Sequence, residues 1–170
     1  MQELQLKLKE ARVDELEIVT QLAKQIWNKH YVPIIGQQQV DYMVSRMYSP
    51  ESLREQLVEK HHRFFLITFN GKDILGFIST HEEKGDEWFL NKFYILQERA
   101  AKGLGTQAFK KLIELIQPRK LTLTVNRQNY KSINFYFKNN FKIDCVADFD
   151  IGDGYVMNDF VMTWVRSDLS

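Results

Sequence analysis

Apolar and polar residues follow two different periods along this chain. They alternate from Leu4 to Leu8, which predicts a half-buried strand, and they recur at helical spacing after Asp14 and Glu17, which are expected to form a capping box. Pro33 and Gly36 interrupt that helix. In chain order, the predicted elements are a strand at 4–8, helices at 14–32, at 37–47 and from Ser49-Pro50, strands at 64–69, 74–80 and 88–96, a helix at 103–117, a strand at 121–125, a helix at 129–139, and strands at 141–149 and 155–165.

Turn residues indicate how the strands connect. Asn70-Gly71 lies between two apolar runs and is a strong hairpin signal, and the segments 84–86 and 152–154 predict two further turns. Only the middle of the chain has strand-helix-strand connections, so parallel pairing is expected there alone. The pattern therefore predicts an α+β (mixed α/β) fold, in which a mostly antiparallel sheet of about seven strands has a central parallel pair and helices on both faces. A chain of 170 residues is expected to form a single domain, residues 1–170.

Composition narrows the classes of function. A formal net charge of +1 argues against a protein that binds nucleic acid by neutralising many phosphates. No apolar run has the length of a membrane span or a signal peptide, which predicts a cytoplasmic protein without a membrane partner. The single cysteine, Cys145, lies in an alternating segment and is expected in the core. No metal is expected, because His61 and His62 diverge in direction and have no evident third ligand.

A turn with two glycines, residues 101–106, follows the strand at 88–96 and opens a helix. Glycines let the main chain approach a pyrophosphate, whose charge the N–H groups of the first helical turn can bind. A dinucleotide fingerprint also needs an acidic residue about 20 positions on, and residues 122–126 include none. The turn does not match a Walker-type phosphate loop, because Lys102 precedes the glycines and does not follow them. A phosphate cradle and a plain tight turn stay open at this point.

The segment from Asn129 to Phe141 makes the turn more specific. Together with the strand, turn and helix before it, this segment resembles the N-acetyltransferase family known as GNAT, in which the equivalent segments bind acetyl-CoA. The resemblance covers 64–165 in element order, and its specific motifs occupy 88–141. It implies a GNAT-like sheet and an enzyme of the EC 2.3.1 type, similar to bacterial small-molecule and polyamine acetyltransferases.

The resemblance also implies roles for individual residues. The strand at 93–95 would contact the pantetheine arm through its main chain, and the glycine turn would hold the pyrophosphate. Tyr136 would be catalytic, because a phenol with a pKa near 10 stays protonated at neutral pH and can donate to a departing thiolate. The implied cofactor-binding residues are Phe93, Tyr94, Ile95, Ala101, Lys102, Gly103, Leu104, Gly105, Thr106, Asn129 and Lys138. The implied acceptor-lining residues are Trp27, Tyr31, Tyr42 and Asn91.

Three positions depart from the family pattern. Ala100 stands where relatives carry Arg or Gln, and Asn140 stands where glycine is common, although Asn tolerates a left-handed φ. Asn91 lies in the region where many relatives have a glutamate base. The base is therefore expected to be an ordered water or a side chain from an adjacent strand end; the candidates are His81, Glu82, Glu83 and Glu87. Acidic residues gather at the final hairpin, which either attracts a polyamine or is a solvated turn; they are Asp148, Asp150, Asp153 and Asp159.

The acceptor is expected to be a primary amine, either of a small molecule, with polyamines among the candidates, or of a peptide. A monomer or a homodimer is expected. A non-catalytic CoA-binding or sensing module is the alternative, and it would bind CoA without turnover. An unrelated nucleotide-binding oxidoreductase is a third hypothesis, weakened by the missing ribose carboxylate.

Overall fold

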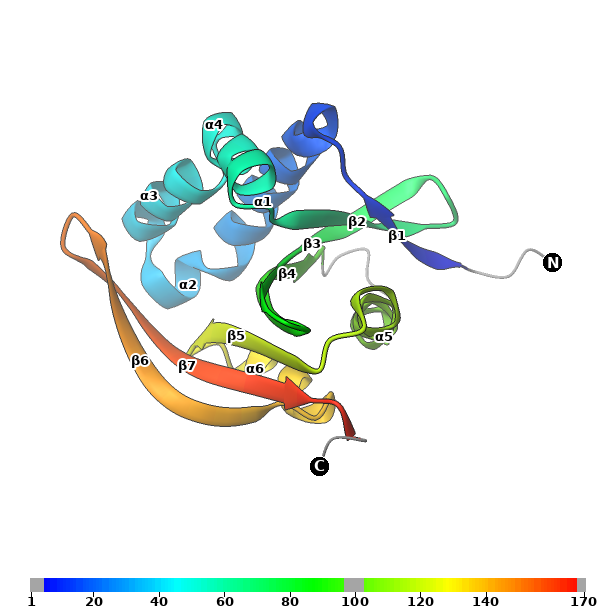
Figure 1. Cartoon of the computed structure of the whole chain (residues 1–170). Helices are drawn as coiled ribbons and strands as arrows, with labels where there is room; N and C mark the ends of the chain where they lie inside the picture. Colours follow the sequence, from blue (N-terminus) through cyan, green and yellow to red (C-terminus); the bar gives the residue numbers. More distant parts are fainter. Residues whose placement is uncertain (1–4, 97–102, 168–170) are drawn as a thin grey trace. The chain divides into compact units, whose positions relative to one another are not determined.

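The computed structural model describes residues 5–96 and 103–167, whose helices and strands are drawn in Figure 1. The strands are β1 (Leu6–Glu10), β2 (Arg63–Phe69), β3 (Asp73–Lys84), β4 (Glu87–Ile95), β5 (Lys120–Asn126), β6 (Lys142–Gly152) and β7 (Tyr155–Val165). The helices are α1 (Leu16–His30), α2 (Val32–Ile35), α3 (Gln37–Met47), α4 (Pro50–Arg54), α5 (Leu104–Ile116) and α6 (Tyr130–Lys138). A 3₁₀ turn at Val13–Glu15 precedes α1, and a π-helical turn at Glu55–Glu59 follows α4.

The seven strands form one mixed sheet in the order β1-β2-β3-β4-β5-β7-β6. β4 and β5 are parallel, with Trp88 opposite Leu121, whereas β1–β2, β2–β3, β5–β7 and β6–β7 are antiparallel. The predicted mixed fold with a central parallel pair is therefore confirmed. β7, the last strand in the chain, lies between β5 and β6, so that β6 forms one edge of the sheet.

Contacts divide the chain into two compact units. The first contains the chain up to His81 together with residues 92–117, and the second contains Glu82–Asn91 and the chain from Pro118 on. β4 therefore contributes residues to both units. The single domain expected from the sequence stays a prediction. None of the helices within 5–96 and 103–167 has the length and apolar character of a membrane span.

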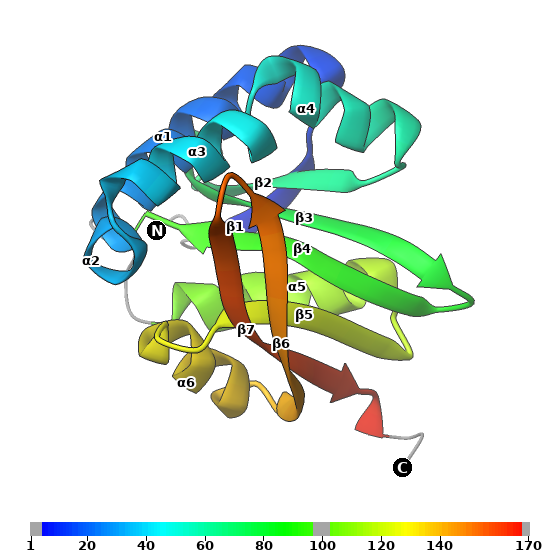
Figure 2. The ribbon, with the colours of Figure 1, turned by 90° about the vertical axis from the view of Figure 1, so that its left-hand side faces the viewer.

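In the first unit, α1 to α4 lie on one face of β2 and β3, and α5 lies on the other (Figures 1 and 2). Tyr48 and Phe77 are fully buried between the helices and the strands, and their rings meet edge to face with centroids 5.9 Å apart. At Gly76 on β3, a Cβ atom would overlap the carbonyl oxygen of Tyr94 and lie 2.9 Å from the Cα of Ile95. Glycine is therefore what lets β3 and β4 approach this closely.

In the second unit, β5 and β7 are well covered but β6 is not. Leu121 and Met162 are fully buried, whereas Val146 on β6 is 58% exposed. Cys145, expected in the core, is exposed, so that prediction was wrong. An edge strand can keep the apolar alternation of a buried strand while neither of its faces is covered. Phe137 on α6 is exposed, because it lies one residue beyond the buried Tyr136 and therefore on another side of the helix.

The starts of two helices give one correction and one confirmation. The predicted capping box of Asp14 and Glu17 is wrong, because α1 begins only at Leu16 after the 3₁₀ turn. Glu15 supplies the carboxylate there, and it accepts the main-chain N–H of Arg12 at 3.1 Å. Ser49 caps α4 as predicted, with its hydroxyl accepting the main-chain N–H of Ser52 at 3.1 Å.

Asn140, which links α6 to β6, adopts the left-handed conformation that its place in the family pattern requires. Its φ is +71°. Asparagine is among the few residues with a side chain that reach this region at small cost. The replacement of the usual glycine by asparagine therefore leaves this turn intact.

Candidate functional site

The glycine turn opens α5 in a way that suits an anion. Gly103 is left-handed, with φ +90°, and no side chain caps the first turn of the helix. A Cβ atom at Gly103 would meet nothing within 4 Å, so the main chain there is open to approach. Gly105 and Thr106 are half-buried, whereas Leu104 points into the core and is 4% exposed. The N–H groups of this turn can therefore bind a phosphate.

Two residues of the predicted cradle, Ala101 and Lys102, lie outside the described residues, as does Ala100. Their predicted roles stay predictions. The pyrophosphate fit consequently rests on Gly103 and the first turn of α5.

Three predicted site residues come together in the first unit. The rings of Trp27 and Tyr31 stack with centroids 4.4 Å apart, and the ring of Tyr94 lies 6.0 Å from that of Trp27 and 6.3 Å from that of Tyr31. Trp27 and Tyr31 are 3% and 8% exposed, so most of their surface serves core packing. Tyr94 is half-buried, as is Phe93, whereas Ile95 is buried.

The other two predicted acceptor-lining residues are placed differently. Tyr42 is half-buried on α3, and its hydroxyl accepts a hydrogen bond from the Arg46 guanidinium at 2.7 Å. Asn91 belongs to the second unit and is half-buried on β4. The structure therefore groups Trp27 and Tyr31 with β4 in the first unit.

In the second unit, α6 presents Asn129 and Tyr136. Asn129 is 2% exposed and is the N-cap of α6, where its side-chain oxygen accepts the main-chain N–H of Ser132 at 3.3 Å. Tyr136 is 8% exposed, and its ring meets those of Phe135 and Phe141 with centroids 5.5 Å and 5.3 Å away. This packing fixes the direction of the phenol. Lys138 is exposed, which suits either a reach for phosphate or plain solvation.

β4 also carries a buried lysine, Lys92, which the sequence did not indicate as a functional residue. Lys92 is 5% exposed, its ammonium donates to the side-chain oxygen of Gln56 at 2.6 Å, and it lies over the rings of Tyr48 and Phe64. Burial, and then repulsion from Lys60, lower the pKa of Lys92 from 10.5 to about 7. The sequence shows a lysine in an apolar strand, but its burial depends on the helix that covers it.

The free energy of unfolding should depend on pH through Lys92. Because the folded pKa of about 7 lies below the ordinary 10.5, the unfolded chain binds more protons between these values, and stability rises with pH across that window. We expect a gain of about 3 kcal/mol between pH 7 and 9.5, measured by urea unfolding, from the value of each pKa unit. Lys92→Met should remove this slope.

Lys60→Met is the matched control, because Lys60 is exposed and pairs with Glu55 at 3.6 Å. This variant should keep nearly the whole pH dependence. A Lys92→Met protein whose stability still rises as steeply as that of the wild type would contradict the assignment of the slope to Lys92.

A histidine pair lies near this lysine in the first unit. The rings of His62 and His81 stack with centroids 4.5 Å apart and an interplanar angle of 7°. Burial, followed by His81, Lys92 and Lys60, lowers the pKa of His62 to about 4. His62 is therefore neutral at physiological pH, and His81, a candidate base in the sequence, is packed against it.

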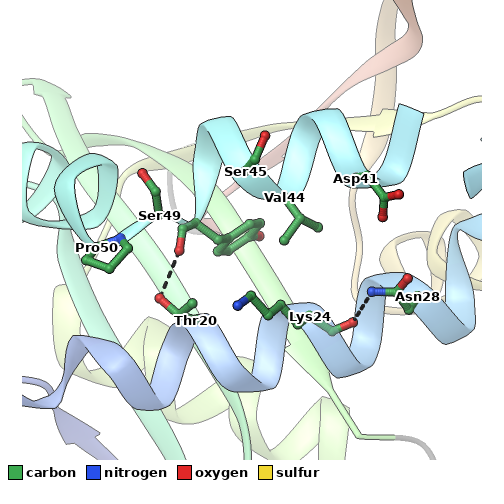
Figure 3. A pocket seen from close by; sticks show the side chains of 9 residues that line it. Thr20, Lys24, Asn28, Asp41, Val44, Ser45, Ser49 and Pro50 are labelled. Atoms are coloured by element: carbon green, nitrogen blue, oxygen red, sulfur yellow. Dashed lines mark hydrogen bonds between the residues drawn. The ribbon is translucent and has the colours of Figure 1, made fainter. Parts of the chain in front are cut away.

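A hollow of about 410 Å³ lies between α1 and α3 in the first unit (Figure 3). Its lining residues are Thr20, Lys24, Asn28, Asp41, Val44, Ser45, Tyr48, Ser49 and Pro50. The Thr20 hydroxyl donates to the carbonyl of Tyr48 at 2.8 Å, and the Gln37 amide donates to Asn28 and Asp41 at 2.7 and 2.8 Å. The hollow includes none of the predicted acceptor-lining residues. The bonds of Thr20 to Tyr48 and of Gln37 to Asn28 join α1 to α3 and its C-cap, whereas the bond of Gln37 to Asp41 lies within α3.

Comparison with known proteins gives consistent matches. Residues 24–141 match the sequence profile described as the Acetyltransferase (GNAT) family. A spermidine N(1)-acetyltransferase of Thermoplasma acidophilum is 22% identical over 147 residues, which cover 83% of this chain and 91% of that protein.

Solved structures share the fold. The PaiA N-acetyltransferase of Thermoplasma acidophilum, crystallised with coenzyme A, has a TM-score of 0.77 and 21% identity and covers 95% of this chain and 99% of that one. The spermidine N-acetyltransferase of Vibrio cholerae, crystallised with CoA and spermine, has a TM-score of 0.68 and 18% identity, with 96% of each chain covered.

Proposed function

Because the chain belongs to the acetyltransferase (GNAT) family, and is thus an N-acetyltransferase that uses acetyl-CoA, we propose that it acetylates a primary amine of a small molecule, with polyamines as the favoured acceptors. The observation that carries the choice of acceptor is the match to a spermidine N(1)-acetyltransferase over nearly the whole of that relative. The peptide-amine alternative, the cytoplasmic location and the monomeric or homodimeric state stay predictions.

The residues present fit the cofactor. The uncapped first turn of α5 and the open main chain at Gly103 would hold the pyrophosphate. The main chain of β4 from Phe93 to Ile95 would contact the pantetheine arm. Asn129 would contact the same arm, as the family resemblance implies. When bound, acetyl-CoA supplies the acetyl group as a thioester.

Tyr136 would give the departing thiolate its proton. Its ring is held by Phe135 and Phe141, so the hydroxyl needs little reorganisation to donate. A main-chain N–H of β4 near Tyr94 would meet the negative charge that develops on the carbonyl oxygen.

The proton lost by the amine needs a separate destination. Asn91 cannot accept it. Among the neighbouring carboxylates, Glu87 is paired with Arg119, and Glu82 accepts the main-chain N–H of Asp86 at 3.1 Å. We assign this proton to ordered water, since Glu82 and Glu87 have partners of their own and His81 is stacked on His62.

Thiol release from acetyl-CoA tests the proposal directly. We expect spermidine and spermine to raise release well above hydrolysis without acceptor, and amino acids, aminoglycosides and peptides with a free N-terminus to raise it less. The acetylated product should be identified by mass spectrometry. Peptides that outperform every polyamine would overturn the choice of acceptor, and CoA binding without release for any amine would favour the non-catalytic module.

A further inference from the structure

One carboxylate of the final hairpin differs from the others. Asp159 on β7 is 1% exposed, whereas Asp148, Asp150 and Asp153 are exposed. In the sequence, these four residues form one acidic group around a turn. The structure separates Asp159 from that group, and solvation of a turn cannot account for it.

Neither carboxylate oxygen of Asp159 has a hydrogen-bond partner among the described residues. The cation whose charge acts on Asp159 is Arg127, and its guanidinium pairs with Asp148 at 2.9 Å and donates to the main-chain carbonyl of Asp159 at 3.2 Å. A buried carboxylate without donors is costly, and a water, an ion or a ligand group can supply the donors that it needs. A cationic group is the chemical complement.

The place of Asp159 in the ladder connects it to the predicted cofactor residues of the same unit. Asp159 lies opposite Asn126, the last residue of β5. The main-chain carbonyl of Asn126 accepts the N–H of Asn129 at 3.0 Å, and Asn129 opens the helix that carries Tyr136. The unpartnered carboxylate therefore lies at the end of β5 from which the chain enters the predicted catalytic helix.

We propose that Asp159 binds the protonated amino group of the acceptor, an inference that rests on the function proposed above. Burial, and then the charge of Asp148, raise the pKa of Asp159 to about 6. The Thr124 hydroxyl, which is near the carboxylate but outside hydrogen-bond geometry, and the charge of Arg127 both lower this pKa. The carboxylate is therefore charged at pH 7.5 and loses its charge as the pH falls through about 6. An ammonium group, positive throughout this range, would supply the hydrogen bonds that both oxygens lack.

Asp159→Asn tests the proposal, because asparagine keeps the shape and removes the charge. We expect the Kd for spermidine, titrated calorimetrically with CoA bound, to rise at least about tenfold at pH 7.5, as for other buried charge pairs that lose one partner. The KM for spermidine should rise similarly, and kcat should change less. In the wild type the Kd should also rise as the pH falls below 6, and in the variant this rise should be absent.

Asp153→Asn is the matched control, since Asp153 is on the same hairpin but is exposed, and asparagine tolerates its left-handed φ of +50°. It should leave the Kd within about twofold of the wild type, as expected for an exposed charge. Stability provides a second readout. Above pH 6 the burial of the Asp159 charge opposes folding, so Asp159→Asn should melt no lower than the wild type at pH 7.5. A variant that binds spermidine poorly only because it unfolds would contradict the proposal.

The outcomes separate this inference from the proposed function. If amines stimulate thiol release and Asp159→Asn keeps the wild-type Kd, the enzyme stands and the role of Asp159 is refuted. If spermidine binds in an Asp159-dependent way without any release, the amine site stands and the catalytic function fails. A wild-type protein that binds no amine at all, with CoA present, overturns both.

Discussion

Tyr136→Phe should lower turnover by about 100-fold, within the range that a single acid or base contributes, while leaving the Kd for CoA nearly unchanged. The phenylalanine ring keeps the contacts with Phe135 and Phe141, so only the hydroxyl is lost. The departing thiolate would then take its proton from solvent. Steady-state thiol release gives kcat, and calorimetric titration gives the affinity for CoA.

Tyr130→Phe is the control for this substitution. Tyr130 begins the same helix but is 70% exposed, and it should tolerate loss of its hydroxyl without change in kcat. If Tyr136→Phe weakens CoA binding as much as it lowers turnover, the hydroxyl supports the site and is no proton donor.

Gly76→Ala should destabilise the protein by about 3 kcal/mol, because overpacking against rigid main chain is among the most damaging substitutions. The added methyl group would overlap the Tyr94 carbonyl oxygen, and a carbonyl in a strand cannot rotate away as a flexible side chain can. β3 would have to move from β4, which would displace Phe93–Ile95 and weaken CoA binding too. Urea unfolding and CoA titration measure the two effects.

Gly154→Ala provides the comparison within the chain. Gly154 has φ +78° in the β6–β7 turn, and an added Cβ would meet nothing within 4 Å. The cost there is conformational strain alone, about 1 kcal/mol, and CoA binding should not change. If the two variants unfold at the same urea concentration, the close approach of β3 and β4 does not explain the destabilisation by Gly76→Ala.

The elements of this fold that the sequence predicts well are those with local signals. Asn70 has φ +55° and Gly71 has φ +69°, as the Asn-Gly hairpin requires, and Ser49 caps α4. Gly103 is the N-cap of α5, which begins at the next residue, Leu104, as predicted from the glycine turn. Each of these depends on conformational preferences of a few adjacent residues, which the sequence alone specifies.

What depends on distant residues was not predictable in the same way. The alternation around Cys145 gives the spacing of a strand but not its position at the edge of the sheet, where neither face is covered. The burial of Lys92 and Asp159 depends on side chains and strands far away in the chain. A sequence motif was enough to predict the candidate cofactor site. The burial of Lys92 and Asp159 is seen only when the residues around them are placed by the fold.

The place of β7 has a consequence for how the protein is made. This strand is the last in the chain, yet it pairs with both β5 and β6. On the ribosome, β5 and β6 emerge before the strand that must join them, so this region of the sheet cannot close until Tyr155–Val165 has been synthesised. Until then Val146 and its apolar neighbours are carried on a strand without its partner, which is the kind of segment that chaperones hold. Completion of the second unit therefore waits for the synthesis of β7.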